Sequence, residues 1–145
     1  MTDARLRQAR PDDHERIRAV AEVSKGYWGH DHERVKTWAA SLELGGEIWV
    51  AELGDDIVAW MALLPPDDGS CELDHLWVEP HAIGSGLGTA LFRHATARAR
   101  ELGARQLRWE AEPNAVGFYE RMGGETVGTA TSSWGRTLPV MRVEL

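Results

Sequence analysis

The stretch HLWVEPHAIGSGLGTALF, residues 75–92, contains three closely spaced glycines between an apolar strand and a helix. An apolar strand runs into Pro80, and three glycines then stand at alternate positions, Gly84, Gly86 and Gly88, before a helical pattern begins. Glycine weakens strands and helices alike, so three of them at a helix start indicate a backbone that comes unusually close to another group. Backbone N–H groups at the amino end of a helix suit an anion. The stretch therefore predicts either a phosphate-binding turn or a tight turn without a ligand.

Two familiar nucleotide motifs do not fit this stretch. A P-loop needs Gly-Lys-Ser/Thr at the helix start, whereas this sequence has Gly88-Thr89-Ala90 and no lysine in the loop. A dinucleotide-binding turn needs its third glycine at position 89 and follows the first strand of a βαβ unit. Because position 89 is a threonine, we expect neither nucleotide hydrolysis nor dinucleotide binding here.

The composition limits the fold and the partners. A chain of 145 residues, 43% of them hydrophobic, is long enough for one domain and short for two, so we expect a single domain over residues 1–145. The formal charge of −7 argues against nucleic acid and anionic membranes as partners. No run approaches the ~20 apolar residues of a membrane-spanning helix. The amino-terminal residues show no signal-peptide pattern, so the sequence predicts a cytoplasmic protein.

Hydrophobic periodicity predicts one strand, two helices, three strands, a helix, a strand, a helix and two final strands along the chain. The expected strands cover residues 4–10, 48–53, 57–64, 71–78, 106–110, 125–131 and 138–145. The expected helices open at Asp12, which would form a capping box with Glu15, at Asp31, after the glycines and at Ala115. This order predicts an α/β fold with a mixed, mostly antiparallel sheet of about six to seven strands and helices on both faces.

Two segments give the sequence a resemblance to a known family. The run VEPHAIGSGLG, residues 78–88, resembles the cofactor signature of the GNAT superfamily, the acyl-CoA-dependent N-acetyltransferases, although Ile83 stands where that signature usually has Arg or Gln. The run EPNAVGFYERMGG, residues 112–124, is similar to a second element of the family, with Glu112 in place of the usual Asn. The resemblance implies the GNAT fold and acetyl-CoA as cosubstrate. No metal is expected, because no Cys or carboxylate spacing completes a site with His14, His30 and His32.

The resemblance also implies where acetyl-CoA binds. Its pyrophosphate would meet the glycine turn, and its pantetheine arm would pair with the backbone of the preceding strand near Leu76 and Val78. The residues expected to bind the cofactor are Leu76, Trp77, Val78, Ile83, Gly84, Ser85, Gly86, Leu87, Gly88, Thr89, Ala115, Phe118 and Tyr119.

Three side chains are candidates for the chemistry of acetyl transfer, which needs a base, a polarised carbonyl and a proton for the departing thiolate. Glu72 and Asp74 alternate on one face of their strand and are the candidate bases, with a solvated pair of surface charges as the alternative. By the resemblance, Tyr119 is the general acid that protonates the CoA sulfur, and a core residue beside Phe118 is its alternative role. A backbone N–H near Leu76 would meet the oxyanion.

The loop between the first two expected helices carries the candidates for acceptor binding. In the superfamily this region, SKGYWGHD at residues 24–31, borders the acceptor pocket, and Tyr27, Trp28 and His30 are the expected contacts. Aromatic faces bind ammonium groups, and a plain anchor between the helices is the alternative. We expect a small-molecule or peptide amine as acceptor and allow for a homodimer. The rival functions are a covalent mechanism through Cys71 and a GNAT-fold sensor that binds acyl-CoA without catalysis.

Overall fold

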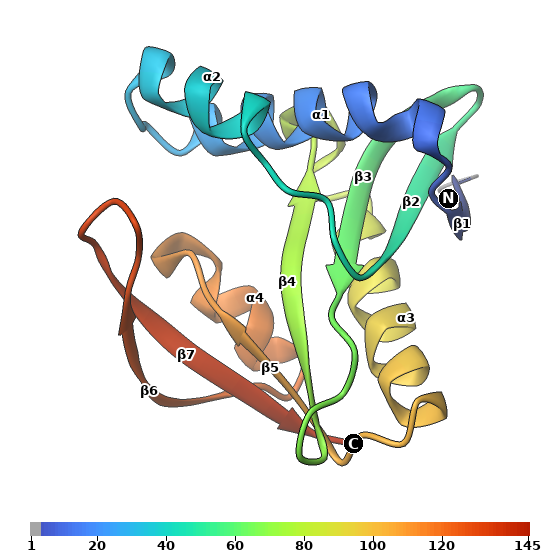
Figure 1. Ribbon diagram of the computed structural model, residues 1–145, viewed down its shortest axis with the longest axis vertical. Helices are drawn as coiled ribbons and strands as arrows, with labels where there is room; N and C mark the ends of the chain where they lie inside the picture. Colours follow the sequence, from blue (N-terminus) through green and yellow to red (C-terminus); the bar gives the residue numbers. More distant parts are fainter. Residues whose placement is uncertain (1–3) are drawn as a thin grey trace. The chain divides into compact units, whose positions relative to one another are not determined.

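The computed structural model describes residues 4–145, which form seven strands and four α-helices in the order β1-α1-α2-β2-β3-β4-α3-β5-α4-β6-β7 (Figure 1). The strands are β1 Ala4–Gln8, β2 Glu47–Leu53, β3 Asp56–Leu63, β4 Ser70–Val78, β5 Gln106–Glu110, β6 Glu125–Thr131 and β7 Thr137–Glu144. The helices are α1 His14–Tyr27, α2 His32–Ala40, α3 Leu87–Glu101 and α4 Val116–Arg121, with short 3-10 turns at Pro11–Asp13, Pro80–Ala82 and Pro113–Ala115. Within residues 4–145, none of the helices is both long enough and apolar enough to cross a membrane.

The strands are hydrogen-bonded in the order β1-β2-β3-β4-β5-β7-β6. The pairs β1–β2, β5–β7 and β6–β7 are antiparallel, whereas β4 and β5 are parallel. The parallel pair is the one whose strands are joined through a helix, α3, because parallel neighbours need a crossover connection. The predicted α/β fold with a mixed, mostly antiparallel sheet is confirmed.

The helix starts follow the sequence signals in one case and depart from them in another. Asp31 caps α2 as predicted, since its carboxylate accepts the Arg34 backbone N–H at 2.9 Å. The predicted capping box at Asp12 is wrong. Asp12 lies in the 3-10 turn before α1, and there the Asp13 carboxylate accepts the Arg10 backbone N–H at 2.7 Å.

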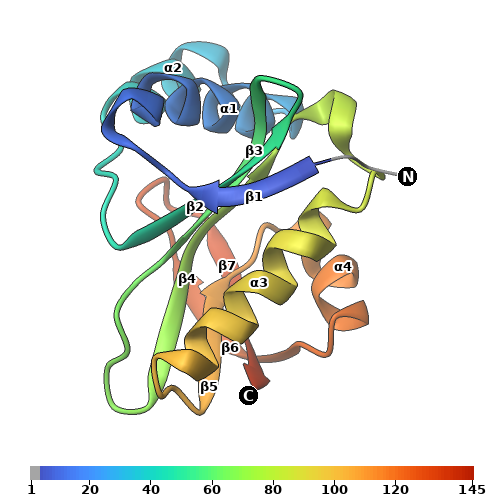
Figure 2. The same cartoon turned by 90° about the vertical axis from the view of Figure 1, so that its right-hand side faces the viewer.

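The chain divides into two compact units, and the described part of the first covers residues 4–62 and His75–His94. Helices α1 and α2 lie close together (Figure 1) and pack on one face of β2 and β3. The buried residues of this cluster are Ile17, Val20, Ala21, Ile48, Val50, Ile57, Trp60 and Ala62. On the other face of β2, the rings of Trp49 and His94 of α3 lie with their centroids 4.1 Å apart. Helices therefore cover both faces of β2, and β1 borders its edge (Figure 2).

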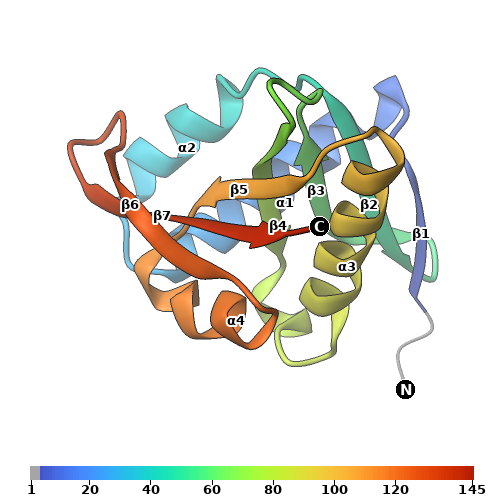
Figure 3. The ribbon, with the colours of Figure 1, turned by 90° about the horizontal axis from the view of Figure 1, so that it is seen from below.

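The second unit consists of Leu63–Asp74 and Ala95–Leu145. In it β5, β7 and β6 lie side by side (Figure 3). Helix α4 packs on β5 through the rings of Tyr119 and Trp109, whose centroids are 4.9 Å apart. Gly124 permits this approach, because a Cβ there would lie 2.9 Å from the Trp109 ring. Along β5 the buried residues alternate with exposed Arg108 and Glu110, so one face of this unit is polar.

Candidate functional site

The predicted site residues fall into both units, and the first unit contains the glycine turn. Gly84 and Gly86 each have φ of +89°, a left-handed conformation that other residues rarely adopt. No atom lies within 4 Å of the position where a Cβ would stand at either residue. Glycine is therefore required by the backbone conformation, and the space beside the turn is open. Leu87 then begins α3, a helix long enough to direct a dipole at this space.

The end of β4 is fixed to α1 by two side chains. The buried Ser24 hydroxyl donates to the Val78 carbonyl at 2.7 Å. Arg16 Nη2 donates to Glu79 Oε1 at 2.6 Å, and His81 Nδ1 lies 2.7 Å from Glu79 Oε2. Glu79 is 9% exposed, so its carboxylate is buried with these partners. The entrance to the glycine turn is thus held by α1, a role that no local sequence signal indicates.

β4 carries a β-bulge before this turn. The Leu64 N–H donates to the Glu72 carbonyl at 2.9 Å, and the Glu79 N–H donates to the Val58 carbonyl at 2.8 Å. Residue 58 thus pairs with 79, and residue 64 with 72. The segment from 72 to 79 is one residue longer than the segment from 58 to 64, so one residue of β4 has no counterpart on β3. Burial in β4 alternates strictly only from Ser70 to Asp74.

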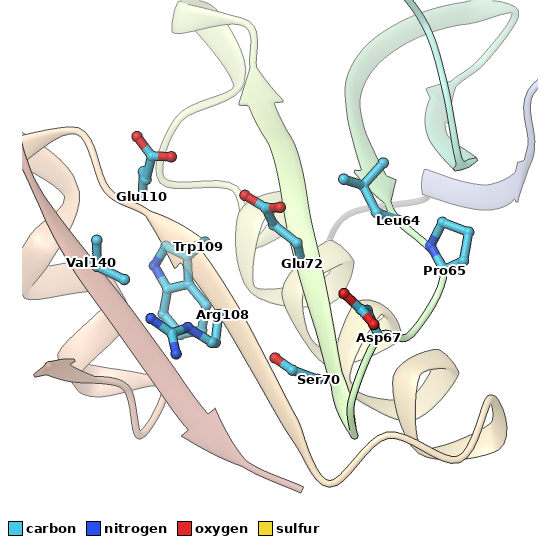
Figure 4. Close-up of a pocket in the computed structure, with 9 residues that line it drawn as sticks. All are labelled: Leu64, Pro65, Asp67, Ser70, Glu72, Arg108, Trp109, Glu110 and Val140. Carbon is cyan, nitrogen blue, oxygen red and sulfur yellow. The ribbon is translucent and has the colours of Figure 1, made fainter. Parts of the chain in front are cut away.

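The second unit contains a cavity of about 440 Å³ (Figure 4). Its lining residues are Leu64, Pro65, Asp67, Ser70, Glu72, Arg108, Trp109, Glu110 and Val140. Burial raises the pKa of Glu72, the negative charges of Asp74 and Glu110 raise it further, and Arg108 opposes them. The structure thus brings one candidate base into a cavity and the other, Asp74, within electrostatic reach of it.

Tyr119, the candidate general acid, is 8% exposed. Its ring lies 4.9 Å from that of Trp109 and 5.1 Å from that of Phe118, measured between centroids. Burial raises the pKa of the phenol, which is therefore protonated at neutral pH. A raised pKa makes complete proton transfer to a thiolate harder, while a hydrogen bond to the sulfur stays favourable.

The predicted acceptor residues lie where α1 ends. The rings of Tyr27 and Trp28 meet edge to face with centroids 5.0 Å apart, and the side chains are 55% and 38% exposed. Sequence reasoning missed that Lys25, in the same segment, contacts two other tryptophans. Lys25 Nζ lies 4.5 Å from the ring centroid of Trp38 and 5.9 Å from that of Trp77, which is cation–π geometry.

Glu112, which departs from the family pattern, has a partner in the second unit. Both of its carboxylate oxygens accept from the Arg136 guanidinium, at 3.2 and 3.3 Å. The pair joins the end of β5 to the turn between β6 and β7. Among residues 4–145, no three His, Cys, Asp or Glu side chains are grouped to hold a metal ion, and Cys71 is buried.

Comparisons with known proteins agree with this fold and these motifs. Residues 8–124 match the model of the acetyltransferase (GNAT) family. Blasticidin-S acetyltransferase of Streptomyces morookaense is 44% identical over 55 residues. The matched segment covers 35% of this chain and 39% of that curated relative. A GCN5-related N-acetyltransferase of Rhodopseudomonas palustris has a TM-score of 0.83 at 24% identity, covering 100% of this chain and 98% of its own. PaiA N-acetyltransferase of Thermoplasma acidophilum, in complex with coenzyme A, has a TM-score of 0.80 at 16% identity, covering 99% and 100%.

Proposed function

The chain belongs to the acetyltransferase (GNAT) family, and from that premise we propose that it is a cytoplasmic N-acetyltransferase that uses acetyl-CoA. The acceptor would be the amine of a small molecule or peptide, which attacks the thioester directly in a ternary complex. The observation that carries the proposal is Glu72, which lines a cavity of about 440 Å³ and, although its side chain is exposed, has a pKa raised by partial desolvation. An acceptor site needs a concave space and a group that takes a proton. A sensor that binds acyl-CoA without catalysis is the alternative.

The residues of the glycine turn fit the cofactor, which when bound supplies an activated acetyl thioester. The open space beside Gly84 and Gly86 admits a group against the backbone at the start of α3. The Ser85 hydroxyl donates to the Ala82 carbonyl, so phosphate binding would rely on backbone N–H groups. Ser24 occupies one acceptor position of the Val78 carbonyl and leaves the second for the pantetheine arm.

β4 carries two of the groups that the chemistry would use, the Glu72 carboxylate and a backbone N–H near Leu76. Glu72 would take a proton from the acceptor ammonium, and the freed amine would form its N–C bond at the carbonyl while the C–S bond breaks. A backbone N–H near Leu76, within the bulged part of the strand, would stabilise the oxyanion. Tyr119 would donate a hydrogen bond to the sulfur as the thiolate leaves. The nitrogen would lose its second proton as the amide forms, and that proton would pass to the sulfur, so the products are the N-acetylated acceptor and the free CoA thiol, with the proton held by Glu72 released to solvent.

Release of the CoA thiol, measured with a panel of amines, tests the proposal. We expect release that depends on the amine, whereas a sensor would bind acetyl-CoA and release nothing.

The cofactor turn is tested by calorimetry on Gly86→Glu, which places bulk and a negative charge beside the expected pyrophosphate. Acetyl-CoA affinity should fall by roughly a hundredfold. Gly86→Ala is the matched control, because it carries the same left-handed strain of ~1–3 kcal/mol without the charge. Equal affinities for the two folded variants would show that the turn is not the pyrophosphate site.

A further inference from the structure

We propose that the acceptor is amino-acid-like: it carries a carboxylate beside the reacting amine and a second cationic group on its side chain. The inference rests on the proposed function, since it takes the cavity of the second unit as the acceptor site. It starts from the ionisable side chains that line this cavity (Figure 4).

These side chains have no partner among the residues that the structure describes. Asp67, Glu72, Arg108 and Glu110 line the cavity, and none of them forms an ion pair or a side-chain hydrogen bond with any residue from 4 to 145. Elsewhere in the same unit an arginine and a glutamate that lie close do bond, as Arg136 does with Glu112 at 3.2 Å. Charges of both signs are thus available to a ligand in one cavity.

The register of the parallel pair sets two of these charges side by side. Glu72 of β4 and Arg108 of β5 are Cα partners. Neighbouring strands lie ~4.8 Å apart, so the two side chains can reach an ammonium and a carboxylate that are attached to the same carbon of one molecule. Arginine binds carboxylates through two parallel hydrogen bonds. An amine placed at Glu72 would therefore have its own carboxylate at Arg108.

The remaining carboxylates account for the second cation. With Glu72 and Arg108 assigned, Asp67 and Glu110 leave the cavity with uncompensated negative charge. The backbone of Asp67 is held by hydrogen bonds with Ser70 at 2.8 and 3.0 Å, so its carboxylate projects from a fixed turn. The cavity wall also contains apolar side chains, which pack well against the methylene groups of a long cationic side chain.

Three acceptors that differ by one group test this inference. Lysine carries all three groups, cadaverine lacks the carboxylate, and norleucine lacks the side-chain ammonium. We expect the parent chain to acetylate lysine on its α-amine, identified by mass spectrometry of the product. The kcat/KM for lysine should exceed that for each analogue by roughly tenfold or more.

Variants then assign each preference to a side chain. Arg108→Gln should abolish the preference of lysine over cadaverine, and Asp67→Asn or Glu110→Gln should abolish that over norleucine. Arg142→Gln is the matched control: Arg142 is the Cα partner of Arg108 on β7 but bonds to Glu125 at 2.9 Å. It should leave both ratios unchanged.

The failures of the two proposals are distinguishable. If the parent chain acetylates cadaverine or norleucine as well as lysine, or acetylates only amines that lack the carboxylate or the second cationic group, the amino-acid-like acceptor is overturned and the acetyltransferase stands. If no amine in either panel releases the CoA thiol, both proposals are overturned.

Discussion

The buried carboxylates of the first unit and the cavity carboxylates of the second unit differ in their partners. In the first unit Asp13, Glu52 and Glu79 have side chains only 11–12% exposed, and each bonds to an arginine at 2.6–2.8 Å. In the second unit the carboxylates of the cavity form no ion pair with any described residue. A buried carboxylate that bonds to an arginine cannot lose that partner without leaving an uncompensated charge, whereas an unbonded carboxylate in a cavity has no such partner to lose and is available to a ligand.

The carboxylates bonded to arginine have lowered pKa values, whereas the unbonded Glu72 has a raised one. The hydrogen bonds from Arg7 lower the pKa of Asp13 to about 2, and they lower that of Glu52 as well. Burial and like charge raise the pKa of Glu72. Hydrogen bonds to arginine therefore distinguish the structural carboxylates of this chain from those that are available for chemistry.

The largest effect is expected at Glu72. Glu72→Gln should lower kcat/KM by ~10²–10⁴-fold, because it removes the general base. The parent activity should fall as pH drops through the raised pKa of Glu72, and the variant should lose this acidic limb. The pH–rate profile measures both effects.

Asp74→Asn is the matched comparison for Glu72→Gln. If only Asp74→Asn removes the acidic limb, the base is Asp74. If neither variant does so, the contrast between bonded and unbonded carboxylates has no catalytic meaning. Thermal melting should show that Glu72→Gln is no less stable than the parent, because its charge has no partner to lose.

A smaller effect, on stability, is expected at Asp13. Its pKa of about 2 lies below the unfolded value of ~3.9, so the ionised carboxylate stabilises the folded state. This contribution is fully present above pH ~4 and is lost as the pH falls through about 2. Asp13→Asn should lower the free energy of unfolding by ~2 kcal/mol at pH 7.

Urea unfolding at several pH values measures this difference between parent and variant. The difference should shrink steadily between pH 4 and pH 2, and a difference that stays constant with pH would show that the ion pair with Arg7 is not its source.

The smallest effect is expected at Glu79, which holds the entrance of the glycine turn. Glu79→Gln weakens its bonds to Arg16 and His81, so the KM for acetyl-CoA should rise by roughly fivefold while kcat changes little. Glu52→Gln is the control, since Glu52 is similarly buried and bonds to Arg7 instead. An equal rise in KM for the two variants would mean that Glu79 acts only through general stability.

Local patterns were enough to predict much of the fold. β5 and β6 have the predicted bounds, because strand alternation and flanking turn residues both mark them. The predicted start of α1 was wrong because the Asp13 carboxylate accepts hydrogen bonds from Arg7 on β1 as well as from the backbone of its own turn. Glu72 is a candidate because of its position on the strand, and the glycine turn because of its spacing, and the roles of both in the site stay predictions.

The partners in the site could not be predicted, because the residues that form them lie far apart in the sequence. Arg16 and Glu79 are 63 positions apart, and Arg136 and Glu112 are 24 apart. The unpaired state of Arg108 depends on where every other side chain lies, and no pattern within one segment reports that. Folding brings these charges together or keeps them apart, and the sequence alone does not indicate which.

The segment from 72 to 79, at the end of β4, has one residue more than the stretch along β3 that it pairs with, so we expect its length, as well as its residue types, to matter for function. Removing one residue between 72 and 79 would let the two strands pair without interruption. Every side chain on one side of the deletion would then turn to the opposite face of the sheet. The deletion could yield a more regular strand and still separate Glu72 from the backbone that follows it. In this segment a change in length is more damaging than most changes in residue type.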